Sequence, residues 1–143
     1  MIRVVLDTNI IVSAYLNEDG QPFRVVKLAL AGLVKLCASE AILAEYEELL
    51  RRKSFPLDAR RAALFLKKLR AASAIVKPVS GLPVKLDDPD DIIFLECSEA
   101  AKANYLVTGN TKHFPARWKY TTRVTPATFI TLWHQEHSPS FSP

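Results

Sequence analysis

Residues 2–9 read IRVVLDTN and carry the strongest fold signal in the chain. The β-branched and apolar residues at 2–6 predict a short buried β-strand, and Asp7 follows it directly. In open parallel α/β sheets, ligands bind at the carboxyl ends of the strands. Asp7 therefore stands where such a sheet would place a ligand-binding acid.

Strands and helices alternate along the rest of the sequence. Apolar runs predict four further strands, at residues 34–38, 74–76, 105–108 and 122–124. Helical periodicity and capping residues predict helices at residues 10–16, 22–31, 40–53 and 59–72, from Pro89 onward, and at 126–135. Repeated β–α units imply a parallel sheet of these five strands, covered by helices on both faces.

Two further acids stand at comparable junctions. Glu45 lies in the second turn of the helix after the strand at 34–38, and Asp91 lies in the first turn of the helix opened by Asp88-Pro89. At one sheet edge, Asp7, Glu45 and Asp91 would form a carboxylate cluster. Mg²⁺ and Mn²⁺ prefer oxygen ligands, and carboxylates neutralise their charge. We therefore expect a site for a hard divalent cation, with a metal-dependent nuclease as the leading hypothesis.

The composition is typical of one domain. With 143 residues, 49% of them hydrophobic, we expect a single domain over residues 1–135 and a disordered tail over residues 136–143. No stretch approaches a membrane span, and the polar residues 7–9 interrupt the apolar run that a signal peptide needs. Cys37 and Cys97 are predicted to be buried free thiols, which fits a reducing cytoplasm.

The charge distribution favours polyanionic partners. The formal net charge is +4, and eight of the nineteen lysines and arginines lie within residues 51–70. Such a cluster fits a nucleic-acid surface, because released counterions drive association with phosphates. It fits a solvated helix surface equally well. Four scattered glycines form no phosphate-binding loop, which argues against dinucleotide binding.

Four motifs follow one another along the chain. They are VVLDTN at 4–9, SEAILAEYEELL at 39–50, DDPDD at 87–91, and LVTGN at 106–110 followed by His113-Phe114. In this order they resemble the PIN domain family. Together they cover nearly the whole chain, and they are most similar to small bacterial and archaeal PIN proteins described as toxins of toxin–antitoxin pairs. The resemblance implies a five-stranded parallel sheet in an α/β/α sandwich and Mg²⁺- or Mn²⁺-dependent cleavage of single-stranded RNA. It also implies an antitoxin partner and a homodimer or higher oligomer.

The resemblance assigns the catalytic and metal-binding acids to Asp7, Glu45 and Asp91. Helical periodicity does not choose between Glu45 and Glu47, because they flank the apolar face of their helix on opposite sides. The choice of Glu45 rests on the resemblance. Two acids also have a structural interpretation, Asp7 in an Asx-type turn and Asp91 as a favourable carboxylate at a helix start.

Supporting roles are expected for four other residues. Asp88 matches an auxiliary acid and could equally cap the following helix. Asn9 is expected to support the metal ligands, and Thr108 to line the pocket. Asn110 stands where related proteins often carry an acid after Thr-Gly; its carbonyl oxygen can hold an ion or a water, but it brings no negative charge. His113 is predicted to be a surface or packing residue.

A second class of function also fits the sequence. A catalytically weak or inactive domain could use the same fold to bind RNA or a partner protein. Asn110 favours this alternative, whereas the three acids favour an enzyme. An aspartyl phosphotransferase is disfavoured, because its second acid would stand at position 9, which is Asn9.

Overall fold

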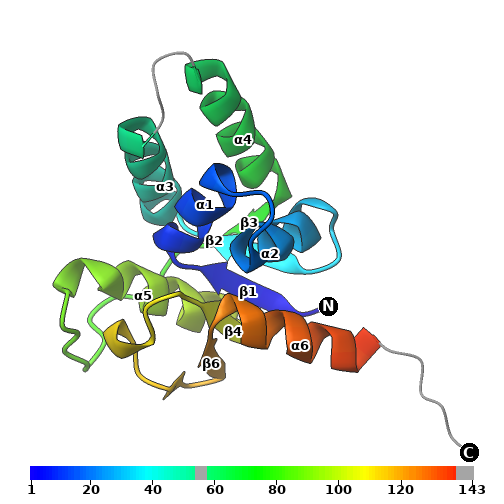
Figure 1. Ribbon diagram of the computed structural model, residues 1–143. Helices are drawn as coiled ribbons and strands as arrows, with labels where there is room; N and C mark the ends of the chain where they lie inside the picture. Colours follow the sequence, from blue (N-terminus) through cyan, green and yellow to red (C-terminus); the bar gives the residue numbers. More distant parts are fainter. Residues whose placement is uncertain (54–57, 138–143) are drawn as a thin grey trace, which may run out of the picture.

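A twisted sheet runs through the molecule with helices on both sides (Figure 1). The computed structural model describes residues 1–53 and 58–137. The strands are β1 (Arg3–Leu6), β2 (Lys35–Ala38), β3 (Ser73–Ile75), β4 (Tyr105–Val107), β5 (Arg117–Trp118) and β6 (Thr121–Val124). The helices are α1 (Thr8–Leu16), α2 (Gln21–Leu30), α3 (Glu40–Lys53), α4 (Ala59–Ala72), α5 (Ile92–Ala101) and α6 (Pro126–His137), with 3₁₀ turns at η2 (Pro89–Asp91) and η3 (Thr111–His113).

The sheet follows the prediction except at one edge. Its strand order is β3-β2-β1-β4-β6-β5, and all pairings are parallel except that of β5 with β6. A turn through Lys119, whose φ is 53°, joins these two strands. The prediction of a purely parallel, five-stranded sheet is therefore wrong at this edge. A strand of two residues has too little periodicity to be recognised in the sequence.

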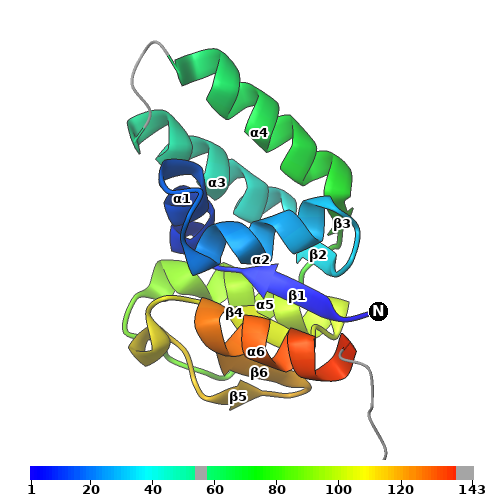
Figure 2. The ribbon, with the colours of Figure 1, turned by 45° about the vertical axis from the view of Figure 1, so that its right-hand side comes forward.

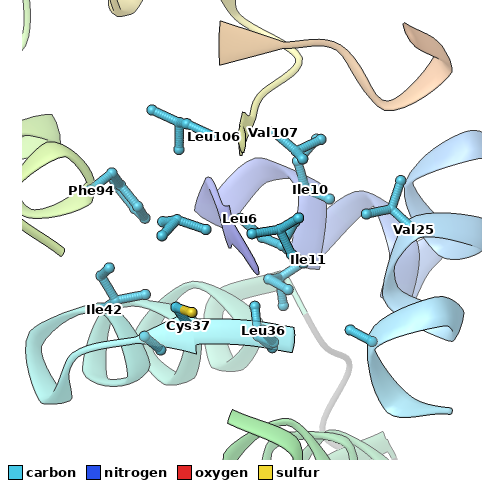
Figure 3. Packing of buried hydrophobic residues seen from close by; sticks show 14 of the residues in the cluster. Leu6, Ile10, Ile11, Val25, Leu36, Cys37, Ile42, Phe94, Leu106 and Val107 are labelled. Atoms are coloured by element: carbon cyan, nitrogen blue, oxygen red, sulfur yellow. The ribbon is translucent and has the colours of Figure 1, made fainter. Parts of the chain in front are cut away.

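The centre of the core is the short strand β1. Val4, Val5 and Leu6 are fully buried, because neighbouring strands and helices on both faces cover them. Figure 3 shows Leu6 among side chains of α1, α3 and α5, with β2 and β4 alongside. Complete burial of a leucine contributes about 1.5–3 kcal/mol to folding. The position of Asp7, which follows this strand, is thus set by a fully buried strand that is paired on both sides.

Helices cover both faces of the sheet. Figure 2 shows α2 and α6 in front of the sheet and α5 behind it, while α1 packs against α2 and α3. Cys37 and Cys97 are buried free thiols, as predicted, and burial raises the pKa of Cys97 to about 12. Within residues 1–53 and 58–137, no helix is both long and apolar enough to cross a membrane.

The C-terminal helix is slightly longer than predicted. It extends to His137, so residues 136–137 are helical and do not belong to a tail. The remainder of the predicted tail, residues 138–143, lies outside the described residues.

The carboxyl ends of three adjacent strands lie at the same edge. Leu6 pairs with Val107, and Val107 pairs with Val124, so the residues after β1, β4 and β6 are neighbours across the sheet. The backbone N–H of Asp7 donates to Val107 O at 3.0 Å. Thr108, which follows β4, is therefore placed beside Asp7.

Candidate active site

Asp7 is the most enclosed acid of the candidate site. Its exposed fraction is 7%, and Thr108 Oγ1 donates a hydrogen bond to its Oδ2 at 2.7 Å. Burial raises its pKa, while the hydrogen bond from Thr108 and the nearby backbone N–H groups of Thr8 and Asn9 oppose that rise. Those N–H groups belong to the start of α1, where unpaired donors and the helix dipole favour an anion. The Asp7 side chain makes no capping hydrogen bond to α1, so the contacts favour the site interpretation of Asp7 over the Asx-type interpretation.

Glu45 faces Asp7 from the second turn of α3. Its Oε2 accepts a hydrogen bond from the hydroxyl of Thr8, and α3 is held to β1 by a hydrogen bond from the Tyr46 hydroxyl to Leu6 O. Burial raises the pKa of Glu45, and the negative charge of Asp7 adds to that rise. Glu47, in contrast, forms an exposed ion pair with Arg51. Glu45 therefore lies beside Asp7, whereas Glu47 points to an exposed partner on its own helix.

Asp91 completes the cluster from the end of η2. Burial is the main reason that its pKa is raised to about 6, and repulsion by Asp7 and Asp88 contributes. His113 Nδ1 lies 3.1 Å from Asp91 Oδ2 and opposes the rise. Asp7 therefore destabilises the charged forms of both Glu45 and Asp91, which shows that the three carboxylates share one electrostatic environment.

A chain of hydrogen bonds links Asp7 to Asp91 through the turn after β4. Thr108 Oγ1, which donates to Asp7, accepts from the backbone N–H of Asn110 at 3.0 Å. Asn110 Nδ2 lies 3.0 Å from His113 Nε2, and the other ring nitrogen of His113 faces Asp91. Asn110 therefore holds the histidine that orients Asp91, a role that the sequence did not indicate.

The remaining predicted residues lie at the rim. Asp88 is exposed and its Oδ1 accepts from Asp90 N at 3.0 Å, so it caps η2 as the structural interpretation proposed. Asn9 is also exposed; its Oδ1 would lie 4.0 Å from a Cβ at Gly109. Two contacts were not foreseen, from Thr8 to Glu45 and from His113 to Asp91. The sequence offered one indication of these contacts: Thr8 lies within the VVLDTN motif, and His113 follows the LVTGN motif closely.

Part of the positive charge clustered within residues 51–70 is paired with acidic side chains. Four of the eight clustered basic residues form exposed ion pairs with acids, as Arg51–Glu47, Arg52–Glu48, Arg61–Glu18 and Arg70–Glu40. Such pairs are typical of a solvated helix surface and contribute about 0–1 kcal/mol each. These contacts favour the solvated-surface interpretation for half of the cluster.

The donor chemistry of the three acids fits a hard divalent cation. The donors are carboxylate oxygens, and each carboxyl group has a raised pKa that a nearby positive charge would lower. In the described part of the chain, no three His, Cys, Asp or Glu side chains are already gathered closely enough to hold an ion. The cluster therefore has the chemistry of a metal site without a closed set of ligands.

We expect Asp91→Asn to stabilise the metal-free protein at high pH. Because the pKa of Asp91 is about 6 in the folded state against an ordinary 3.8, the folded state holds this proton more tightly than the unfolded state does. The free energy of unfolding should therefore fall as pH rises from about 4 to about 6, and then stay level. Removing the charge should recover at most about 3 kcal/mol near pH 8 and little near pH 4.

Thermal unfolding at both pH values measures this effect. Asp87→Asn is the matched control, because it neutralises a neighbouring exposed acid that is not among the charges that raise the pKa of Asp91. An Asp91→Asn gain of equal size near pH 4 and pH 8 would contradict the cause assigned here.

Comparisons with known proteins agree with this fold. A sequence model described as a PIN domain matches residues 3–112, which include all three acids and Asn110. No curated protein matches the chain. Among solved structures, the chain is similar to one in the crystal structure of VapBC2 from Rickettsia felis bound to a DNA fragment from their promoter. The TM-score is 0.59 at 18% identity, with 87% of this chain and 98% of that chain covered.

Proposed function

This chain belongs to the PIN domain family, and from that premise we propose that it is a metal-dependent endoribonuclease that cleaves single-stranded RNA. The observation that carries the proposal is that hydrogen bonds join Asp7, Glu45 and Asp91, which come from three separate elements of the fold. Thr8, next to Asp7, bonds Glu45, and the chain through Thr108, Asn110 and His113 links Asp7 to Asp91. A protein gains no stability from like charges at one edge, whereas a phosphodiesterase needs them to hold a cation.

The side chains around the acids would orient them for this chemistry. A bound Mg²⁺ or Mn²⁺ would supply positive charge to activate water and to stabilise the scissile phosphate. Asp7, Glu45 and Asp91 would hold it. One carboxylate oxygen of each acid already has a partner: Thr108 for Asp7, Thr8 for Glu45 and His113 for Asp91. These contacts fix the direction of the other oxygen of each carboxylate.

We further propose that the protein is the toxin of a toxin–antitoxin pair, with an antitoxin as protein partner, a homodimer or higher oligomer as its assembly, and the cytoplasm as its location. The similarity to a chain of VapBC2 supports this at the level of the fold. A cleft of about 270 Å³ between α1, α2 and α4 also offers an apolar surface, with Phe23, Leu64 and Phe65 among its lining residues. Leu64 is 53% exposed there.

A binding module with little or no activity is the second candidate, and Asn110 favours it, because the site lacks a fourth carboxylate. Cleavage assays on a labelled single-stranded RNA, with Mn²⁺ and with excess chelator, distinguish the two candidates. Cleavage that needs the metal supports the enzyme. RNA retention without cleavage under both conditions supports the binding module.

Metal binding should be visible as thermal stabilisation. A ligand that binds only the folded state adds about 2.7 kcal/mol at roughly one hundred times its Kd. We therefore expect Mn²⁺ or Mg²⁺ to raise the melting temperature of the wild type, and expect a smaller response in Asp7→Asn. Glu47→Gln is the control, because its exposed side chain pairs with Arg51 away from the cluster. A wild-type melting temperature that neither Mn²⁺ nor Mg²⁺ changes would refute the metal site.

A further inference from the structure

The turn after β4 determines how two of the acids are oriented. Thr108, at its start, donates to Asp7, and His113, near its end, contacts Asp91. Asn110 contacts both Thr108 and His113 from the middle of the turn. A displacement of this one turn would therefore disturb both carboxylates together.

Arg123 of β6 bridges the two ends of η3 within this turn. Its Nη1 donates to Thr111 O and to Phe114 O, each at 2.7 Å. Its backbone N–H also donates to Ala116 O at 3.0 Å, just beyond the turn. The guanidinium is part-buried and always charged, and the two hydrogens of Nη1 serve the two carbonyl acceptors.

Hydrophobic packing fixes only the far end of the turn. Phe114 is buried, and its ring meets that of Phe94 edge-on at 6.1 Å. The residues between Asn110 and Phe114 form a single 3₁₀ turn, which has weak hydrogen bonds of its own. Arg123 binds backbone carbonyls at the start of this turn and just after it. The contact therefore holds the residues before Phe114, which are less well buried.

We propose that Arg123 is a positioning residue of the candidate active site, which holds η3 so that His113 stays against Asp91. The proposal deepens the proposed nuclease function and rests on it for the catalytic consequence. The placement of His113 can be measured without any RNA, so the two ideas can fail separately.

The contacts of His113 provide a spectroscopic signature. An amide nitrogen only donates, so His113 Nε2 accepts from Asn110 Nδ2, and the ring hydrogen is on Nδ1, facing Asp91. A ring freed from both contacts would lose this preference. The Nδ1–H tautomer, which nitrogen-15 chemical shifts identify, therefore reports that η3 is in place.

The test compares Arg123→Met with wild type and with Arg3→Met. Methionine keeps an unbranched apolar side chain but donates no hydrogen bonds. We expect Arg123→Met to lose the Nδ1–H signature of His113 and to lower kcat for RNA by about 10–100-fold, the usual effect of removing support from metal ligands. KM should change little, because Arg123 touches the turn and not the substrate.

Arg3→Met is the matched control for general loss of stability. Arg3 Nε donates to Ala101 O at 2.8 Å, at the end of α5, so this variant loses a comparable contact away from η3. We expect it to keep the wild-type His113 signature and kcat. Arg123→Lys retains a cation on a side chain that is one bond shorter, and should give an intermediate signature and rate. If the methionine variant does not fold, the lysine variant is compared with wild type in its place.

Three results would overturn the positioning role. One is an unchanged His113 signature in folded Arg123→Met, the second is loss of that signature in Arg3→Met as well, and the third is an Arg123→Lys variant indistinguishable from wild type in both signature and rate. Wild-type protein that shows the signature but cleaves no RNA would instead count against the proposed nuclease function.

Discussion

Single alanine replacements of Asp7, Glu45 and Asp91 are each expected to lower metal-dependent RNA cleavage by more than about a hundredfold, which exceeds the usual effect of residues that only orient metal ligands. The three acids share one environment, so the loss of any one leaves the others unable to hold the cation correctly. Combining the replacements should cost little more than the largest single effect, because residues that act as a unit are not additive. Initial rates on a labelled single-stranded RNA measure this.

Glu47→Ala is the control for this series. It removes a glutamate from the same helix, but one whose side chain pairs with exposed Arg51. We expect its cleavage rate to stay within about twofold of wild type, as for surface residues away from special features. Activity that survives Glu45→Ala and disappears in Glu47→Ala would show that the wrong glutamate has been assigned to the site.

Asn110→Asp is expected to tighten Mn²⁺ binding by about tenfold, which corresponds to roughly 1.4 kcal/mol. It adds a negative charge to the chain of contacts that joins Asp7 and Asp91. The same change should lower the melting temperature of the metal-free protein, because a fourth carboxylate joins three whose pKa values are already raised. Calorimetric titration with Mn²⁺ and thermal unfolding with and without the metal measure the two opposite effects.

Asn17→Asp is the matched control for Asn110→Asp. It adds the same charge at the other end of α1, where Asn17 Oδ1 accepts from Asp19 N at 3.0 Å and an aspartate can do the same. We expect no change in its Mn²⁺ affinity. An Asn110→Asp variant that also leaves metal affinity, cleavage and metal-free stability unchanged would place Asn110 outside the site.

The sequence by itself determined the class of fold and indicated which acids are candidates for the site. Alternating apolar strands and amphipathic helices are local patterns, so five strands and six helices could be predicted near their observed positions. Asp7 and Asp91 were recognisable because each stands beside a strand end or a helix start. Helical periodicity could not decide between Glu45 and Glu47 as the site residue, because both flank the buried face of their helix.

Only the tertiary structure decided which side chains meet. Thr108 and Asp7 are 101 positions apart in the chain, and they become partners because β4 pairs with β1 in one register. In the same way, η3 places His113 in contact with Asp91, and β6 places Arg123 where it donates to the backbone of Thr111. A periodic pattern reports which face of its own element is buried, but the contacts between elements depend on packing and on hydrogen bonds that no local pattern encodes.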